Sequence, residues 1–226
     1  MLSNLIGKII IIILIGQPGA GKSSLAYLLK KQHKISHITT GEMLLEHVGK
    51  KTPLGKIAES HIFKGELLPD HLVNNMLFDY LDNTQLENCI VLDGYPRSLQ
   101  QAKSLQEKFK DQAIILAVDL NVPDEKIYER IQGRLRCKNC KRAFHKTFFP
   151  PKNEGICDDC QGQLFHRKDD DIIIFKQRLK EYHKSTSPLL EYYWKQNTLL
   201  QLTEGNTPME NYFELLEMIR NFNQEN

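Results

Sequence analysis

Eight residues near the start of the chain have the types and spacing of a phosphate-binding loop. The run Gly16-Gln-Pro-Gly-Ala-Gly-Lys-Ser23 satisfies the pattern G-x-x-x-x-G-K-[ST], which requires a strand before it and a helix after it. Its glycines let backbone N–H groups surround phosphate oxygens, Lys22 reaches the β and γ phosphates, and Ser23 offers an oxygen to Mg²⁺. A glycine-rich turn with a chance lysine is the alternative. The context favours a nucleoside triphosphate site, whose reaction the loop alone does not define.

An aspartate and an arginine follow a second apolar run. Asp93 ends the run Cys89–Asp93, where a carboxylate beside a phosphate loop can hold a water of the Mg²⁺ shell. Alone, Asp93 would be interpreted as a turn residue, but Arg97 lies four residues later. A phosphoryl group in transfer carries negative charge on three oxygens, so we expect several guanidinium groups around it.

Five arginines are candidates for that role: Arg97, Arg130, Arg134, Arg167 and Arg178. Taken singly, each fits a solvated charge on a helix surface. Their setting favours a site. Arg130 and Arg134 are one helical turn apart at the start of a cysteine-rich segment, and Arg167 lies at its end. Arg178 falls on the inward stripe expected of the next helix.

Four of the five cysteines form two C-x-x-C pairs. Cys137 and Cys140 are followed, after sixteen residues, by Cys157 and Cys160. Two such turns close a tetrahedral shell around one Zn²⁺ and leave no open position, which predicts a structural metal. Iron is the main competitor, while two disulfides and a redox pair fit the sequence less well. Cys89, in an apolar run, is interpreted as a small core residue.

The elements that must position these residues alternate between strands and helices. Strand-like runs are expected at 8–15, 35–39, 89–92, 113–120 and 198–202. Helices are expected to start at residues 21, 98 and 123, and further helices to occupy the chain up to about residue 82. Helical spacing also covers 169–194, bent or broken near Pro188, and 208–222. The first run is apolar without alternation, as in a strand covered on both faces. The succession predicts an α/β fold with a parallel sheet flanked by helices and one compact insertion.

Composition excludes several classes of protein. The 226 residues are 41% hydrophobic and 26% charged with a net charge of +2, which excludes a wholly disordered or fibrous chain. The apolar run 9–15 is too short to span a bilayer and flows into the phosphate loop instead of a cleavage site. We therefore expect a cytoplasmic protein without a membrane partner.

Several stretches in order resemble adenylate kinases of the long form with a zinc-bearing lid. The resemblance covers essentially everything after residue 7. Besides the loop, the matching stretches are Thr40-Gly-Glu-Met-Leu44, Gly65-Glu-Leu-Leu-Pro-Asp70, Asp93-Gly-Tyr-Pro-Arg97 with Gln101-Ala102, Gly133-Arg134, Arg167-Lys-Asp-Asp170 and Arg178-Leu-Lys-Glu-Tyr-His183. The resemblance implies reversible phosphoryl transfer from MgATP to AMP, giving two ADP, by a P-loop nucleoside-monophosphate-kinase fold.

The resemblance also implies site residues. For ATP they are Gly19, Ala20, Gly21, Lys22, Ser23, Ser24, Arg130, Arg134, Phe144 and His145, and for AMP they are Thr40, Glu66, Leu67, Leu68, Gly94, Arg97, Gln101, Arg167 and Arg178. The catalytic set is Lys22, Arg97, Arg134, Arg167 and Arg178, with Asp93 holding Mg²⁺ through water. It further implies a cis peptide at Tyr95-Pro96 and a monomer.

Three parts follow from the same resemblance. A P-loop core spans 1–132 and 171–226, a monophosphate-binding segment spans 39–68 within it, and a zinc-binding lid spans 133–170. The segment and the lid are expected to close over the two nucleotides and exclude water, because an open site would hydrolyse ATP.

Two departures and one rival remain. Leu45 stands where the family usually has an arginine for the acceptor phosphate, so a weak or different acceptor monophosphate is an alternative unless His47, Lys50 or Lys51 reaches in. Ser23 and Ser24 replace a common Gly-Thr without losing the loop pattern.

The stretch 130–153 holds eight lysines and arginines and no acid. A P-loop protein that binds nucleic acid through a basic ribbon is therefore the rival from another class, although the small net charge disfavours it.

Overall fold

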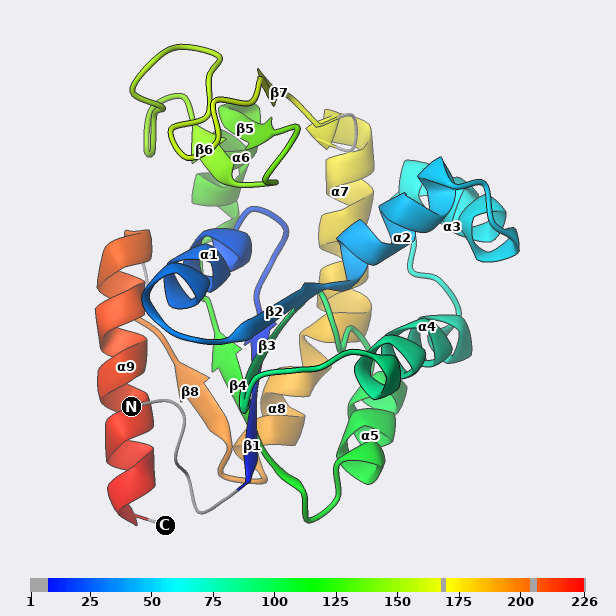
Figure 1. The fold of residues 1–226 in the computed structure, drawn as a ribbon, viewed down its shortest axis with the longest axis vertical. Coiled ribbons are helices and arrows are strands. Elements are labelled where there is room, and N and C mark those ends of the chain that lie inside the picture. The colour runs from blue at the N-terminus through cyan, green and yellow to red at the C-terminus, as the bar shows by residue number, and fades with distance from the viewer. Residues whose placement is uncertain (1–7, 168–169, 204–206, 226) are drawn as a thin grey trace.

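A parallel five-stranded sheet forms the centre of the computed structural model, which describes residues 8–167, 170–203 and 207–225. Its strands lie in the order β2-β3-β1-β4-β8, and every neighbouring pair is parallel (Figure 1). They are β1 (Ile9–Ile15), β2 (Ser36–Thr39), β3 (Cys89–Asp93), β4 (Ala113–Asp119) and β8 (Leu199–Gln201). The expected α/β class is confirmed.

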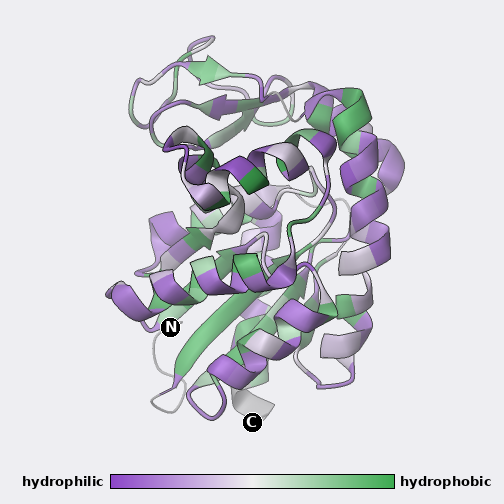
Figure 2. Cartoon of the chain, turned by 90° about the vertical axis from the view of Figure 1, so that its right-hand side faces the viewer, coloured by the Kyte–Doolittle hydropathy of each residue, from purple (hydrophilic) through white to green (hydrophobic). Residues whose placement is uncertain are grey.

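Helices cover both faces of this sheet. They are α1 (Lys22–Gln32), α2 (Thr40–Gly49), α3 (Pro53–Lys64), α4 (Asp70–Asn83), α5 (Leu99–Lys108), α6 (Asp124–Gln132), α7 (Ile172–Glu181), α8 (Pro188–Trp194) and α9 (Pro208–Glu225). Figure 1 shows α2 and α3 projecting from the upper right of the core. In Figure 2 the strands of the sheet are coloured as hydrophobic, whereas the helices carry hydrophilic outer faces.

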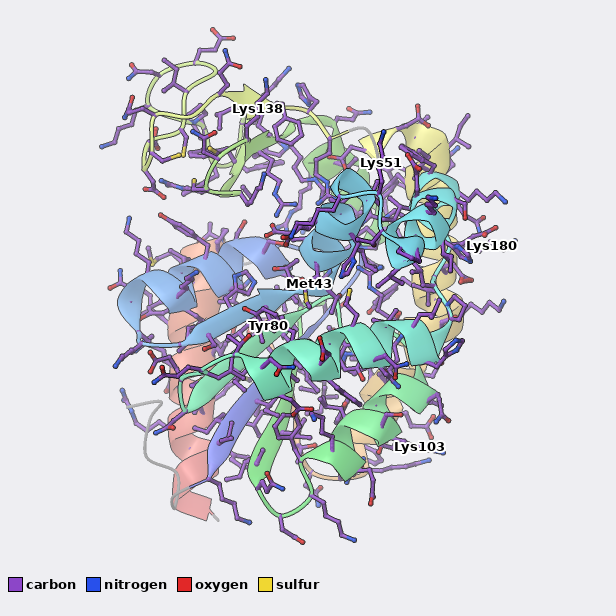
Figure 3. All side chains as sticks on the ribbon, turned by 45° about the vertical axis from the view of Figure 1, so that its right-hand side comes forward. Met43, Lys51, Tyr80, Lys103, Lys138 and Lys180 are labelled. Atoms are coloured by element: carbon purple, nitrogen blue, oxygen red, sulfur yellow. The ribbon has the colours of Figure 1, made fainter. Side chains whose placement is uncertain are left out.

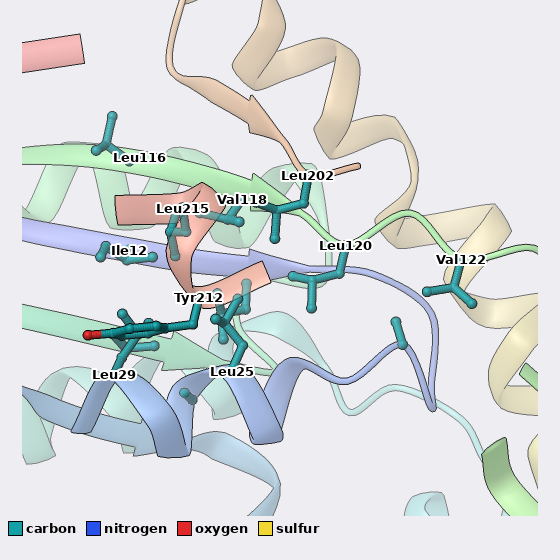
Figure 4. Packing of buried hydrophobic residues seen from close by; sticks show 14 of the residues in the cluster. Ile12, Leu25, Leu29, Leu116, Val118, Leu120, Val122, Leu202, Tyr212 and Leu215 are labelled. Carbon is teal, nitrogen blue, oxygen red and sulfur yellow. The ribbon is translucent and has the colours of Figure 1, made fainter. Parts of the chain in front are cut away.

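Strand β1 explains why the sheet is covered twice. Successive side chains of a strand point to opposite faces, and Ile9–Ile15 is apolar at every position. Ile10 and Ile12 pack into a cluster with helices α1 and α9, part of which Figure 4 shows. Ile11 and Ile13 pack into a second cluster with helices α4, α5 and α8. One continuous β-branched run therefore supplies both halves of the core.

A second, smaller sheet lies above the core in Figure 1. Its antiparallel strands are β5 (Arg134–Cys137), β6 (Ala143–His145) and β7 (Leu164–Phe165), in the order β6-β5-β7. Its interior contains Phe144, Cys137 and Cys157, which are nearly or fully buried. We call the part of the chain between α6 and α7 the lid.

Three details differ from or refine the sequence analysis. Helix α6 ends at Gln132, so Arg134 begins strand β5 and is not one helical turn beyond Arg130 on the same helix. The long helix expected over 169–194 is divided into α7, a π-helical turn (Tyr182–Thr186) and α8, because Pro188 starts a new helix. The peptide bond between Tyr95 and Pro96 is cis, as the resemblance implies. Among the described residues, no helix is both long and apolar enough to cross a membrane.

Candidate active site

The phosphate loop joins the end of β1 to the start of α1. Gly16, Gly19 and Gly21 have φ angles of 153°, 91° and 101°, which favour glycine. A Cβ on Gly16 would lie 2.9 Å from the carbonyl oxygen of Leu120, and one on Gly19 would lie 3.1 Å from the side chain of Ile131. The loop therefore needs its glycines for backbone shape and for close packing. Its backbone turns into the N-terminus of α1, where a phosphate is favoured.

Lys22 and Ser23 hold the polar groups of the loop together. The ammonium group of Lys22 donates to the carbonyl oxygens of Gly16 and Gln17 over 2.6 and 2.8 Å. Desolvation by the surrounding protein lowers the pKa of Lys22 to about 7, against the opposing effect of Asp93. The hydroxyl of Ser23 donates to Asp93 over 2.6 Å, and Asp93 is buried at the end of β3. Ser23 and Asp93 are thus adjacent oxygen groups, which suits Mg²⁺.

One cavity opens beside this loop, and a second cavity shares part of its wall. The larger, of about 510 Å³, is lined by loop residues, by Asp93 and by lid residues. The smaller, of about 90 Å³, lies between helices α2, α3 and α4. Arg97, Arg167 and Arg178 line both cavities, and Lys22 and Arg134 line the larger one. All five residues of the expected catalytic set therefore line the larger cavity.

The smaller cavity contains every residue expected to hold AMP. Its lining includes Thr40, Glu66, Leu67, Leu68, Gly94, Arg97, Gln101, Arg167 and Arg178. The carbonyl oxygen of Gly94 accepts hydrogen bonds from the hydroxyl of Thr40 and from Nε of Arg97, both over 2.9 Å. A Cβ on Gly94 would meet these same two side chains at 3.2 and 3.1 Å. Gly94 therefore allows Thr40 and Arg97 to approach one backbone carbonyl.

The residues expected at the ATP base are distributed over two environments. His145 lines the larger cavity, with Nδ1 accepting the backbone N–H groups of Thr147 and Phe148 over 3.0 Å each. Burial lowers the pKa of His145, which favours the neutral ring. Phe144 borders the same cavity but is only 3% exposed within the lid core.

The remaining donor-side residues lie near the loop. Arg130 and Ser24 line the larger cavity, whereas Ala20 does not, because its side chain is buried in the core. The carbonyl oxygen of Ala20 accepts a hydrogen bond of 3.4 Å from Arg130. Sequence reasoning missed Phe148, Thr207 and Pro208, which also line this cavity. Of these three residues, only Phe148 could have been selected from the sequence, because it is an aromatic residue close to Phe144 and His145.

Two ion pairs that involve residues lining the larger cavity were also missed. Arg134 is paired with Asp170 by two hydrogen bonds, in which Nε and Nη2 of the guanidinium each donate to one carboxylate oxygen. Arg136 of β5 is paired with Glu42 of α2, and both residues line the cavity. The second pair links the segment that forms the smaller cavity to the lid. A sequence offers no pairing signal for residues so far apart.

The four cysteines of the lid converge on one point. Their sulfur atoms all lie within 4.8 Å of one another. A tetrahedron of Zn–S bonds of about 2.3 Å has S–S edges of about 3.8 Å, so the cluster fits such an ion. Cys137 and Cys157 are buried and Cys140 and Cys160 are exposed. Cys89 is buried in β3, where burial raises its pKa to about 12, as expected of a core residue.

The three cations considered as substitutes at the position of Leu45 lie away from both cavities. Leu45 lines the smaller cavity and is 44% exposed. His47, Lys50 and Lys51 line neither cavity. Lys50 instead contacts Glu46 one helical turn away, and Nδ1 of His47 contacts Thr52. The acceptor site therefore gains no cation from these three residues in this structure, and Lys50 and His47 contact local partners instead.

The family model and three relatives that match this chain are all described as adenylate kinases. A family model described as adenylate kinase matches residues 14–198. An adenylate kinase from Caldicellulosiruptor bescii is 43% identical over 86% of this chain and 91% of its own. Adenylate kinases from Clostridium tetani and Symbiobacterium thermophilum are 41% and 40% identical, over 92% and 88% of this chain and 99% and 93% of theirs.

Proposed function

The chain belongs to the adenylate kinase family, whose members transfer a phosphoryl group reversibly between MgATP and AMP, and on this premise we propose which residues carry each step. The observation that supports the assignment best is that Arg97, Arg167 and Arg178 line both cavities. A group that passes from one nucleotide to another must cross between two binding spaces, and this boundary is where its negative charge needs neutralising.

The larger cavity would hold ATP. Backbone N–H groups of residues 19–24 and the ammonium of Lys22 would contact the phosphates, while Arg130 and His145 would lie along the base and ribose. Ser23, and Asp93 through water, would hold Mg²⁺, which neutralises charge on the phosphates when bound.

The smaller cavity would hold AMP, with Thr40, Gly94 and Gln101 near the base and Arg97 on the phosphate. An oxygen of the AMP phosphate would attack the γ-phosphorus, the bond from that phosphorus to the β–γ bridging oxygen would break, and two ADP would leave. The attacking oxygen is already anionic, so no general base is needed. Arg134, Arg167 and Arg178 would neutralise the phosphoryl group in transit.

The lid and the acceptor segment would close together over these nucleotides. We assign residues 133–170 to the lid and 39–68 to the acceptor segment, and the remainder to the core. Zn²⁺ on Cys137, Cys140, Cys157 and Cys160 would keep the lid folded without contacting the reacting atoms. Thiolates that hold a metal require a reducing compartment, so we place the protein in the cytoplasm. Since one chain supplies both cavities, we propose a monomer.

A coupled assay of ADP formation tests this proposal. With MgATP as donor, AMP should give a kcat/KM at least tenfold above CMP, GMP and UMP. Equal or faster transfer to another monophosphate would replace AMP as the acceptor, which Leu45 makes worth testing. Tight, salt-sensitive binding of RNA or DNA without any phosphoryl transfer would favour the basic-ribbon alternative instead.

A further inference from the structure

Helix α4 contacts Gln101, a residue that lines the smaller cavity, and the proposed mechanism does not use this contact. Asp70, the first residue of this helix, accepts a hydrogen bond of 2.8 Å from Nε2 of Gln101. At the other end of the same amide, the backbone N–H of Arg97 donates to Oε1 of Gln101 over 2.7 Å. Gln101 is only 2% exposed. Its side-chain amide is therefore held by the protein on both sides.

The two contacts impose the same orientation on that amide. A carboxylate only accepts hydrogen bonds, so Asp70 must face the NH₂ group of Gln101. A backbone N–H only donates, so Arg97 must face the oxygen. Rotating the amide by half a turn would place its oxygen against the carboxylate and its NH₂ group against the N–H. Each of these two contacts would be repulsive. Because the site is buried, water could not satisfy the groups instead.

The backbone of Gln101 is linked to the same helix through Tyr95. The hydroxyl of Tyr95 shares its single proton between Oδ1 of Asn74, at 2.7 Å, and the carbonyl oxygen of Gln101, at 3.2 Å. Asn74 lies one turn after Asp70 on α4 and is buried. Ser98 accepts the backbone N–H of Gln101 over 3.2 Å. Asp70 of α4 therefore sets the polarity of the Gln101 side chain, while Tyr95, which also contacts Asn74 of α4, and Ser98 hold the backbone of Gln101.

The donor and acceptor positions of the Gln101 amide that the protein does not occupy determine which ligand the amide recognises. An amide offers two donors and two acceptor sites, and the protein occupies one of each. One N–H of Nε2 and one lone pair of Oε1 are left for a ligand in the cavity that Gln101 lines. A 6-aminopurine complements this edge, because its ring nitrogen N1 accepts and its exocyclic amine donates. A 6-oxopurine presents the reverse polarity, with N1–H as donor and O6 as acceptor.

We propose that Asp70 is a positioning residue that fixes the amide of Gln101 in the one orientation that selects a 6-aminopurine over a 6-oxopurine as acceptor. The inference rests on the acceptor site proposed above. It also gives Asp70 a role beyond its favourable place at the N-terminus of α4, where any acid would serve.

The test compares AMP with inosine monophosphate, which has the same size and differs at these two positions. In Asp70→Ala the amide loses its acceptor, and the ratio of kcat/KM for AMP to that for inosine monophosphate should fall about tenfold. Asp70→Asn removes the same charge but keeps an acceptor oxygen. This variant should keep the ratio within about threefold of the wild-type value, because the hydrogen bond, and not the charge, sets the orientation.

Controls separate this role from a structural one. Asp79→Asn removes a charge from the exposed face of the same helix, where the Asp79 carboxylate accepts a hydrogen bond from the side-chain amide of Asn83, and should leave the ratio unchanged. A loss of stability would lower the rates with both substrates and leave their ratio unmoved. If Asp70→Ala fails to fold, Asp70→Ser replaces it in the test. The serine hydroxyl lies one bond closer to the backbone than the carboxylate oxygens of aspartate, so it should not reach Nε2 of Gln101.

Two outcomes would overturn the inference. They are an unchanged ratio in a folded Asp70→Ala variant, and an equal fall in Asp70→Ala and Asp70→Asn. Gln101→Leu distinguishes these from failure of the proposed acceptor site. If Gln101→Leu leaves the KM for AMP unchanged, the site itself is misplaced. If that KM rises while the Asp70→Ala ratio stays at the wild-type value, the site stands and only the role of Asp70 is wrong.

Discussion

Tyr27 of helix α1 donates a hydrogen bond of 2.5 Å from its hydroxyl to Asp159, which lies between two cysteines of the lid. Asp159 is also paired with Arg142 over 2.6 Å, and the guanidinium of Arg142 lies 4.9 Å from the centre of the Tyr27 ring. The guanidinium of Arg142 also lies 4.5 Å from the centre of the Phe144 ring in the lid core. The metal-binding turn of the lid is thus joined to the helix that starts at the phosphate loop.

We predict that Tyr27→Phe weakens closure of the lid. The variant keeps the ring beneath Arg142 and removes only the hydroxyl, whose hydrogen bond contributes about 1 kcal/mol. The KM for MgATP should rise up to about fivefold, while kcat and the KM for AMP change little. Tyr80→Phe, an exposed tyrosine on α4, is the matched control. An unchanged KM for MgATP in Tyr27→Phe would show that this contact does not stabilise the nucleotide-bound lid.

The pair between Glu42 and Arg136 should couple the two nucleotide sites. It joins α2 of the acceptor segment to β5 of the lid. We expect Glu42→Gln and Arg136→Gln each to reduce the tightening of AMP binding that a non-hydrolysable ATP analogue produces. In the double variant the effects should not add, with a coupling free energy of about 1 kcal/mol from calorimetric titrations. Fully additive effects would mean that the pair does not transmit closure.

Leu45 provides a test by gain of function. Leu45→Arg should place a guanidinium at the wall of the smaller cavity, where a charge-assisted hydrogen bond contributes about 1.5–3 kcal/mol. The KM for AMP should fall about tenfold or more. Because Leu45 is 44% exposed, the substitution should not disturb the core. Leu45→Gln should give a smaller effect, and an unchanged or raised KM in Leu45→Arg would show that the acceptor phosphate lies elsewhere.

Loss of the lid metal should affect stability before chemistry. Cys137→Ala removes one of four ligands, and we expect the melting temperature to fall by about 10 °C, which corresponds to a loss of about 3–4 kcal/mol in a chain of this length. Zinc measured by atomic absorption should fall from one per chain toward zero. Cys89→Ala, in the core, should leave the zinc content unchanged. Lost activity with unchanged melting would assign the metal a role in the reaction instead.

The loop and the sheet could be predicted from sequence because their signals are local. The apolar run Ile9–Ile15 and the glycine spacing after it are each readable within a few residues, and the structure has both where they were expected. Arg97, Arg167 and Arg178 could be selected from their positions around the cysteine-rich segment and the apolar runs, the resemblance supports the same choice, and all three line both cavities.

The remaining contacts depend on how distant segments meet. Tyr27 and Asp159 are 132 positions apart, and Asp70 and Gln101 are 31 apart, so neither pairing leaves a periodic or local trace. Arg134 was misplaced for a local reason, because its spacing from Arg130 fits a helix but α6 ends before Gly133. His47 and Lys50 appeared available because a sequence does not show that Thr52 and Glu46 already contact them.

The measurement that tests the account most directly is the turnover of Arg178→Ala against that of Lys180→Ala on the same helix. Arg178 lines both cavities, whereas Lys180 is exposed and points outward, as Figure 3 shows. Arg178→Ala should lower kcat for ADP formation about 10²- to 10³-fold with KM values within about tenfold, because its charge matters most in the transition state. Lys180→Ala should match the wild type. A kcat for Arg178→Ala within tenfold of the wild-type value would contradict the proposal that this arginine neutralises the phosphoryl group in transit.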